Sequence, residues 1–231
     1  MLGPWVRKLS TVLLAPRCLV CAESGHAGLD LCVDCRAALP WNHQACRQCG
    51  LPLPDDGSDC GRCREATPPY TRTQSALRYA FPIDRLLPRF KFHGDLAAGA
   101  VLATLMHWAL DPADFPQLLI PVPLHPARLR QRGYDQALEL TKALSRECRL
   151  PLCGNRLRRV RATEPQTELG AEARQRNVRR AFGLRAGPPL PAHVALVDDV
   201  MTTGATVSEC AETLLDAGVD RVDIWTIARA L

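Results

Sequence analysis

The stretch VALVDDVMTTGATV, Val194 to Val207, decides how the second half of this chain folds. Its four leading apolar residues, Val194–Val197, are typical of a strand that is buried on both faces of a parallel sheet. We expect that strand to end at Asp198 and Asp199. A loop over Val200–Gly204 follows, which is rich in hydroxyl groups and contains a glycine, and a helix is predicted directly after it.

The pattern on both sides of this stretch alternates between strands and helices. Such alternation predicts an α/β fold in which helices cover a parallel sheet. The residues from Thr71 to Phe81 also alternate, which predicts a strand that could form half of a hairpin. The other predicted elements are helices over 85–110 with a break near 93–95, over 127–148 and over 205–218, and strands over 118–123, 193–199 and 221–230.

The residues after the predicted strand suit a phosphorylated sugar. Ligands bind at the carboxyl ends of strands in open α/β sheets, and the N-terminus of a helix offers free N–H groups and a positive dipole to a phosphate. Thr202, Thr203 and Thr206 add hydroxyl donors, and Gly204 allows a close approach of the backbone. Two carboxylates would repel a phosphate, but they can hold ribose hydroxyls, or Mg²⁺ through water. The simpler alternative is an acidic turn that caps a helix.

Two acids followed by a Thr-Thr-Gly-x-Thr loop resemble the phosphoribosyl pyrophosphate (PRPP) motif of type I phosphoribosyltransferases. The resemblance implies that Asp198 and Asp199 bind the ribose hydroxyls and act in catalysis. It also implies that the loop binds the 5′-phosphate and that PRPP binds together with Mg²⁺. The PRPP-binding residues it implies are Asp198, Asp199, Val200, Met201, Thr202, Thr203, Gly204, Ala205 and Thr206.

The front of the chain carries four C-x-x-C pairs that repeat every 14 residues, from Cys18 to Cys32, Cys46 and Cys60. Each pair places two thiolates on one tight turn, so that four pairs can bind two structural Zn²⁺ ions. Disulfides are typical of exported proteins, and redox C-x-x-C motifs do not occur four in a row, so we favour zinc. Sequential and cross-braced pairing both fit the spacing, and His26 and His43 are interpreted as surface residues. The predicted ligands are Cys18, Cys21, Cys32, Cys35, Cys46, Cys49, Cys60 and Cys63.

Two further segments narrow the resemblance. IPVPLHPARLRQRGYDQA (residues 120–137) and RATEPQTELGAEARQRNVRRAF (residues 161–182), together with the cysteine pairs and FKFHGD at 90–95, resemble the ComF/GntX family over nearly the whole chain. Asp135 stands where that family more often has Asn. The resemblance implies a pyrophosphate-binding loop after the strand at 118–123 and a loop over 161–174 that closes over the site. The implied pyrophosphate-binding residues are Leu124, His125, Arg128 and Arg132.

The predicted architecture is therefore a type I phosphoribosyltransferase-like parallel sheet with flanking helices, preceded by a small zinc-ribbon domain with four-cysteine sites. We expect an N-terminal helix over 1–17, a double zinc ribbon over 18–66 and a phosphoribosyltransferase-like domain over 70–231. The apolar run in residues 1–17 is short and interrupted by Lys8, which favours a helix packed on the body over a signal peptide. No segment is apolar for long enough to span a membrane, and we expect a cytoplasmic protein.

Three functions remain open at this stage. The ComF/GntX resemblance implies a PRPP-binding protein of natural competence or DNA utilisation, with competence-machinery proteins as partners. The first alternative is a phosphoribosyltransferase of nucleobase or nucleotide salvage with a zinc appendage. No residues that would recognise a nucleobase are evident in the sequence. The acceptor substrate and the enzymatic activity are therefore undefined. A zinc-ribbon adaptor with a vestigial PRPP site is the second alternative. An arginine cluster that includes Arg158 and Arg159 could track single-stranded DNA or serve pyrophosphate and solubility instead.

The net charge gives little support to a nucleic-acid partner. The formal charge of the chain is +5. A zinc ion held by four thiolates carries about −2, so that two such sites would bring the total to about +1.

Overall fold

A parallel four-stranded sheet forms the centre of the body. The computed structural model describes residues 16–54, 59–161 and 181–231. The strands are β1 (Arg72–Arg78), β2 (Leu118–Pro121), β5 (His193–Met201) and β6 (Arg221–Arg229), and they lie in the order β1-β6-β5-β2. All neighbouring strands pair in parallel. The parallel sheet is confirmed, whereas the hairpin considered for β1 is wrong, because its partner is the last strand of the chain.

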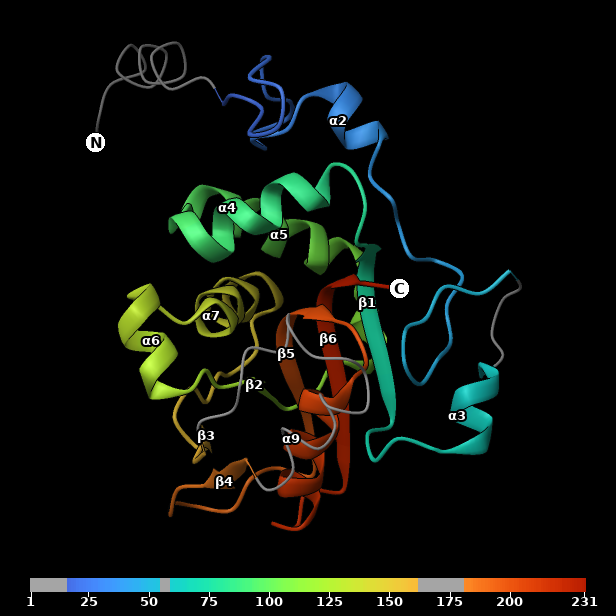
Figure 1. The fold of residues 1–231 in the computed structure, drawn as a ribbon, viewed down its shortest axis with the longest axis vertical. Helices are drawn as coiled ribbons and strands as arrows, with labels where there is room; N and C mark the ends of the chain where they lie inside the picture. Colours follow the sequence, from blue (N-terminus) through green and yellow to red (C-terminus); the bar gives the residue numbers. More distant parts are fainter. Residues whose placement is uncertain (1–15, 55–58, 162–180) are drawn as a thin grey trace.

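Helices cover both faces of this sheet (Figure 1). On one face, α5 (Leu96–Ala109) and α7 (Gln136–Cys148) contact each other and the strands, and α4 (Ile83–His93) packs on α5. On the other face, α9 (Ala205–Leu215) contacts β5 and β6. The side chains of Asp95 and Asp135 cap α5 and α7 by accepting the N–H groups of Ala98 and Leu138. These caps fix where the two covering helices begin.

Shorter elements complete the body. The 3-10 helix η1 (Pro112–Asp114) precedes β2, and α6 (Pro126–Arg132) follows it. The break predicted near residues 93–95 lies between α4 and α5, where Gly94 is left-handed. The single helix predicted over 127–148 is two helices, because Gly133 adopts a φ of 81° and ends α6. Strands β3 (Leu157–Arg159) and β4 (Phe182–Leu184) form a separate antiparallel pair.

The cysteine-rich segment lies along the sheet edge formed by β1 (Figure 1). It contains two short helices, α2 (Val33–Ala37) and α3 (Gly61–Glu65). The N–H of Asn42 donates to the carbonyl of Ala76 at 3.1 Å, and the N–H of Thr73 donates to the carbonyl of Arg47 at 2.9 Å. The segment therefore covers the edge that β1 would otherwise expose.

Two further expectations concern the ends of the chain and membranes. The helix predicted over 1–17 lies almost entirely outside the described residues, which begin at 16. Within the ranges that the structure describes, no helix is long and apolar enough to cross a membrane.

A buried carboxylate joins the sheet to η1. Asp223 on β6 is fully buried. Its carboxylate accepts hydrogen bonds from Arg221 at 2.8 and 3.0 Å and from the ring of His193 at 3.1 Å. Arg72 on β1 lies 3.5 Å away, and both arginines also contact Asp114 of η1. This network connects three of the four strands.

We expect Asp223→Ala to lower the free energy of unfolding by about 3–5 kcal/mol, because it removes the buried anion that three cationic or donor side chains share. Asp114→Ala is the matched control, since it removes a more exposed partner of the same arginines and should cost under about 1 kcal/mol. Urea denaturation of the two variants measures the difference. Equal losses would show that burial of Asp223 does not matter to the network.

Candidate functional site

A cavity of about 350 Å³ lies where the carboxyl ends of β2 and β5 meet the start of α9. Both segments that the sequence singled out therefore contribute to one site. The residues that line it are Lys91, Val122, Pro123, Leu124, Arg128, Arg132, Gln136, Arg159, Asp198, Asp199, Val200, Met201, Thr202, Thr203, Gly204, Ala205, Thr206 and Val207.

The two aspartates lie within β5 and not after it. The strand continues to Met201 because Val200 and Met201 still pair with Ala228 and Arg229 of β6. The predicted strand end at Asp198 and Asp199 is therefore wrong by two residues. Asp199 is buried, and Asp198 is half-buried. Because neighbouring residues of a strand point to opposite faces, the two carboxylates leave the backbone in different directions.

Backbone hydrogen bonds hold the acids in place. Oδ1 of Asp198 accepts the N–H of Asp199 at 2.8 Å, and Oδ1 of Asp199 accepts the N–H of Val200 at 2.6 Å. The pKa of Asp198 is raised to about 8, first by burial and then by the charge of Asp199. Two acids this close to each other resist ionising together.

The raised pKa of Asp198 predicts a pH-dependent stability. A carboxyl of an unfolded chain ionises near pH 4, so between about pH 4 and 8 the native state keeps a proton that the unfolded state releases. Stability therefore falls as the pH rises through this window. Asp198→Asn removes the charge and should raise the free energy of unfolding by about 1–2 kcal/mol more at pH 9 than at pH 6. Urea titrations measure it, with the exposed Asp220→Asn as control, and a pH-independent effect would contradict the assignment.

The loop Thr202–Thr206 has the geometry of an anion site. Gly204 has a φ of 84°, and a Cβ there would lie 2.8 Å from Cε of Met201 and 3.3 Å from the hydroxyl of Tyr70. The positive φ favours glycine, whereas the ends of the two neighbouring side chains could shift to admit a Cβ. Helix α9 begins at Ala205, as predicted, and Gly204 provides no side-chain cap for its first turn. The N–H of Ala205 donates to Oγ1 of Thr203 at 3.4 Å, and a helix N-terminus of this kind, with the positive end of its dipole, suits an anion.

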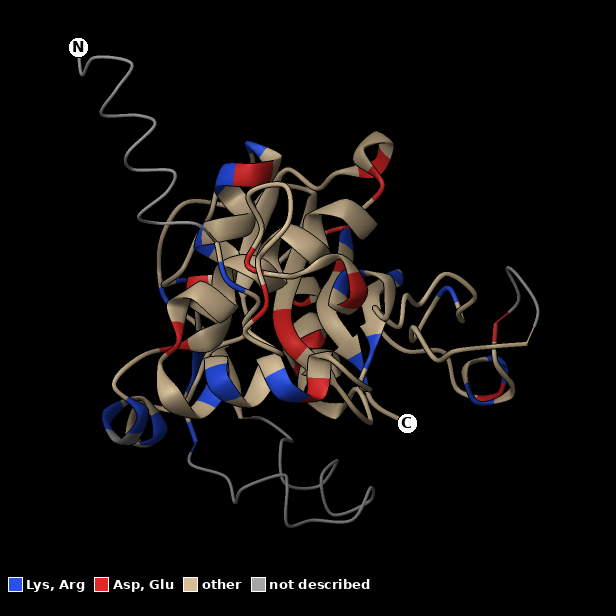
Figure 2. Ribbon diagram, turned by 90° about the horizontal axis from the view of Figure 1, so that it is seen from above, with Lys and Arg blue, Asp and Glu red and all other residues tan. Residues whose placement is uncertain are grey.

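The β2 side of the cavity is basic. Helix α6 carries three arginines and no acidic residue (Figure 2). Arg128 and Arg132 line the cavity, and Nη2 of Arg128 is buried without a hydrogen-bond partner among the described residues. Burial and the neighbouring Arg132 lower the pKa of Arg128. A guanidinium nitrogen that is buried without a partner favours an anionic ligand.

Two residues predicted on this side have other bonds. The ring of His125 accepts the N–H of Ala127 at 3.2 Å and caps α6, and His125 is absent from the cavity lining. Leu124 does line the cavity, but its N–H donates to Oδ2 of Asp135 at 3.1 Å. Pyrophosphate binding by His125 and Leu124 thus stays a prediction. The backbone N–H of Leu124 is already bonded to Asp135.

The cavity also contains residues to which the motif argument gave no role. Lys91 of α4 forms an ion pair with Asp199 at 2.9 Å. Gln136 is 2% exposed, and its Oε1 has no partner among the described residues. Arg159 of β3 is buried, with its guanidinium 5.3 Å from the ring of Phe182. The sequence signals were the segment FKFHGD for Lys91, the Arg-Gly-Tyr-Asp-Gln run for Gln136 and the arginine cluster for Arg159.

The arginine cluster does not form one face in the described residues. Arg158 is exposed, whereas Arg159 lines the cavity, because adjacent residues of β3 point to opposite sides. Arg159 therefore does not share an exposed surface with Arg158, and single-stranded DNA binding by the pair stays a prediction. Four further arginines, Arg174, Arg176, Arg179 and Arg180, lie outside the described residues, as does the loop predicted over 161–174 beyond its first residue.

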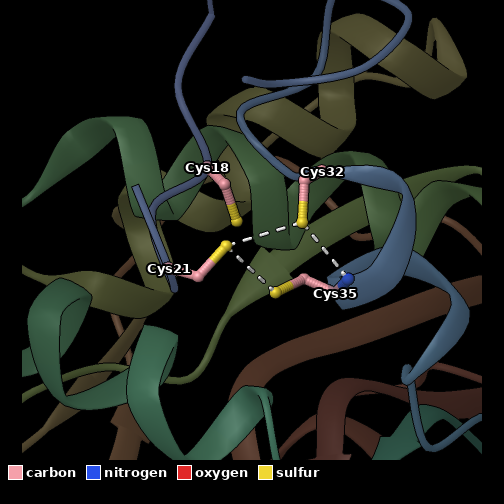
Figure 3. A group of neighbouring side chains, drawn as sticks. All are labelled: Cys18, Cys21, Cys32 and Cys35. Carbon is pink, nitrogen blue, oxygen red and sulfur yellow. Dashed lines mark hydrogen bonds between the residues drawn. The ribbon is translucent and has the colours of Figure 1, made fainter. Parts of the chain in front are cut away.

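The eight predicted cysteines form two clusters. The first is Cys18, Cys21, Cys32 and Cys35, and Figure 3 shows their four sulfur atoms pointing toward one another. The second is Cys46, Cys49, Cys60 and Cys63. Within each cluster the Sγ atoms lie within 4.8 Å of one another, which fits tetrahedral Zn²⁺. The pairing is sequential and not cross-braced, and His26 and His43 are exposed, as interpreted.

Comparisons with known proteins agree with this description. The model of the double zinc ribbon domain matches residues 9–64. Competence protein F of Haemophilus influenzae is 34% identical over 93% of this chain and 97% of its own length. The DNA utilization protein YhgH of Escherichia coli O157:H7 is 35% identical over 90% of this chain and 92% of its own. The chain therefore belongs to the ComF/GntX family, as the motifs indicated.

A solved structure was also matched. Orotate phosphoribosyltransferase from Aeropyrum pernix has 18% sequence identity and a TM-score of 0.37, covering 65% of this chain and 78% of that chain.

Proposed function

We propose that this protein binds PRPP together with Mg²⁺ in the cavity between β2, β5 and α9, and that it acts in the uptake or utilisation of external DNA. One observation carries the ligand assignment. The cavity joins a carboxylate pair and the N-terminus of α9, which lie in one stretch of the chain, with a pair of arginines from another. PRPP carries the matching groups, namely ribose hydroxyls, a 5′-phosphate and a pyrophosphate.

The three groups of the ligand can be assigned in turn. The N–H groups at the start of α9 would receive the 5′-phosphate, with the hydroxyls of Thr202 and Thr203 beside it. The carboxylates of Asp198 and Asp199 would accept the ribose hydroxyls. Arg128 and Arg132 would then face the pyrophosphate, where they would stabilise the negative charge that develops if the group departs.

The acidic pair also fits the magnesium ion that accompanies a pyrophosphate. Carboxylates and waters are the ligands that Mg²⁺ prefers, so that Asp198 and Asp199 would hold it through water. When bound, the ion neutralises phosphate charge.

The biological part of the proposal rests on the relatives. Proteins named for competence in Haemophilus influenzae and for DNA utilisation in Escherichia coli span nearly the whole of this chain. A third, competence protein ComFC of Streptococcus pneumoniae, is 30% identical over 61% of this chain. Single-stranded DNA and competence-machinery proteins are accordingly the partners that we propose, and the cytoplasm is the proposed location.

Isothermal titration calorimetry of the zinc-loaded protein tests the ligand assignment. We expect Mg²⁺-PRPP to bind with a micromolar dissociation constant, and ribose 5-phosphate and Mg²⁺-pyrophosphate to bind more weakly and to compete with it, because each carries part of the recognised groups. Absence of PRPP binding to a folded protein with two zinc ions would contradict the proposal.

A further inference from the structure

Lys91 brings a positive charge to the acids of the cavity from a distant part of the chain. Its Nζ lies 2.9 Å from Oδ1 of Asp199, and its side chain is 23% exposed. Burial by itself would lower the pKa of Lys91, but the charges of Asp199 and Asp198 raise it. The lysine is therefore held as a cation between the acids and the basic side of the cavity, which Arg132 also lines.

The backbone around Lys91 is fixed by packing. Phe90, the preceding residue of α4, is buried, and its ring lies so close to α5 that a Cβ on Gly99 would be 2.6 Å from it. On the other side, the guanidinium of Arg132 lies 5.2 Å from the ring of Phe92. The helix is thus locked on α5 with its end beside the arginines of α6. Any change of partner for the ammonium group must come from rotation within the lysine side chain.

The ion pair competes with the proposed binding of the ribose for Oδ1 of Asp199. Oδ1 of Asp199 already accepts hydrogen bonds from Nζ of Lys91 and from the N–H of Val200. These two bonds use the two lone pairs of that oxygen. A ribose hydroxyl that bonds to the same oxygen must displace Lys91, and a partly buried ammonium that loses its partner needs another anion.

We propose that Lys91 is a pyrophosphate-binding residue, which Asp199 holds in place in the ligand-free protein and the ribose hydroxyls release toward the pyrophosphate. This inference rests on the proposed function. The released ammonium joins Arg132 on the pyrophosphate, so that one side chain couples the two halves of the ligand. PRPP should therefore bind more tightly than the separate affinities of ribose 5-phosphate and pyrophosphate predict.

Calorimetry on the zinc-loaded full chain tests the coupling with three defined probes, namely Mg²⁺-PRPP, Mg²⁺-pyrophosphate and ribose 5-phosphate. We expect Lys91→Met to weaken the binding of Mg²⁺-PRPP by about tenfold or more, because it removes a charge-assisted hydrogen bond. Mg²⁺-pyrophosphate should be weakened less, because without ribose hydroxyls Asp199 keeps the lysine. Ribose 5-phosphate should bind unchanged or more tightly, because Asp199 no longer has to release a lysine. Lys91→Arg keeps the charge and should restore most of the affinity for PRPP.

The possible results separate the two proposals. Equal weakening of all three probes by Lys91→Met would show that Lys91 serves the acids alone, and unchanged affinity for PRPP and pyrophosphate would show that it does not reach the ligand. Either result overturns the Lys91 assignment while leaving the PRPP site intact. Native protein that binds none of the probes would overturn the PRPP site itself. Zinc content and thermal melting of each variant verify that it is folded.

Discussion

Replacing Cys49 by Ser is expected to remove one zinc ion per chain and to abolish cooperative folding. Structural zinc contributes about 10–16 kcal/mol in small zinc domains, which is comparable to the whole stability of a typical domain of about 5–15 kcal/mol. The described residues around the second cysteine cluster, 46–54 and 59–63, include few large apolar side chains, so little else can replace the metal. Zinc analysis by mass spectrometry and calorimetric melting measure the two effects.

The position of Cys49 extends this expectation to the cavity. The carbonyl of Cys49 accepts a hydrogen bond from Nε of the buried Arg229 at 2.9 Å, and Nη1 of Arg229 donates to the carbonyl of Met201 at 3.1 Å. Met201 directly precedes the loop at Thr202. Loss of the second zinc should therefore loosen the end of β5 as well as the ribbon.

Cys148→Ser is the matched control, because Cys148 lies outside both clusters and contacts the ring of His107 at 3.3 Å. We expect two zinc ions and a change in unfolding free energy under about 1 kcal/mol. A Cys49→Ser protein that keeps two zinc ions, or that melts as the native chain does, would show that the second cluster is not a structural zinc site.

Replacing both Asp198 and Asp199 by Ala is expected to weaken Mg²⁺-PRPP binding by about 10²-fold or more. Hydrogen bonds to a charged group contribute about 1.5–3 kcal/mol each, and the double variant removes two carboxylates that would accept ribose hydroxyls. Loss of Asp199 also leaves the ammonium of Lys91 without its partner, so thermal melting verifies that the double variant is folded. Calorimetric titration of the zinc-loaded variant measures the loss of affinity.

Asp220→Ala controls for the general removal of negative charge. Asp220 is exposed, in the turn between α9 and β6, and does not line the cavity. We expect it to bind Mg²⁺-PRPP with native affinity. A double variant that also binds as tightly as the native chain would place the ligand away from the acids.

Patterns with a local physical cause were predictable from the sequence. The C-x-x-C repeat predicted the eight zinc ligands, because ligand spacing on a tight turn is a property of neighbouring residues, but it left their pairing open. The apolar run before Asp198 predicted β5 as a buried strand, and Gly204 marked the start of α9. These features require no knowledge of the rest of the chain.

Features that depend on distant partners were not predictable. Whether β1 pairs with a neighbour or with β6 depends on how the sheet assembles, and the two extra residues of β5 are held by their pairing with β6. Arg158 and Arg159 point to opposite sides because they are adjacent residues of β3, which pairs with β4.

The place of Lys91 in the site also could not be predicted from the sequence. Lys91 lies 108 positions before its partner Asp199, and no spacing rule connects the two. The sequence marked its segment as typical of the family, but its place beside the acids required the packing of α4 on α5. The site residues that sequence reasoning missed are thus those that the tertiary fold brings in from other elements.

A crystal structure of the zinc-loaded protein grown with Mg²⁺ and PRPP tests the central claim most directly. We predict density for the 5′-phosphate at the N–H groups that begin α9, for the ribose hydroxyls at Asp198 and Asp199, and for the pyrophosphate beside Arg128 and Arg132. A cavity free of ligand at saturating PRPP, or a ligand bound elsewhere on the protein, would contradict the account.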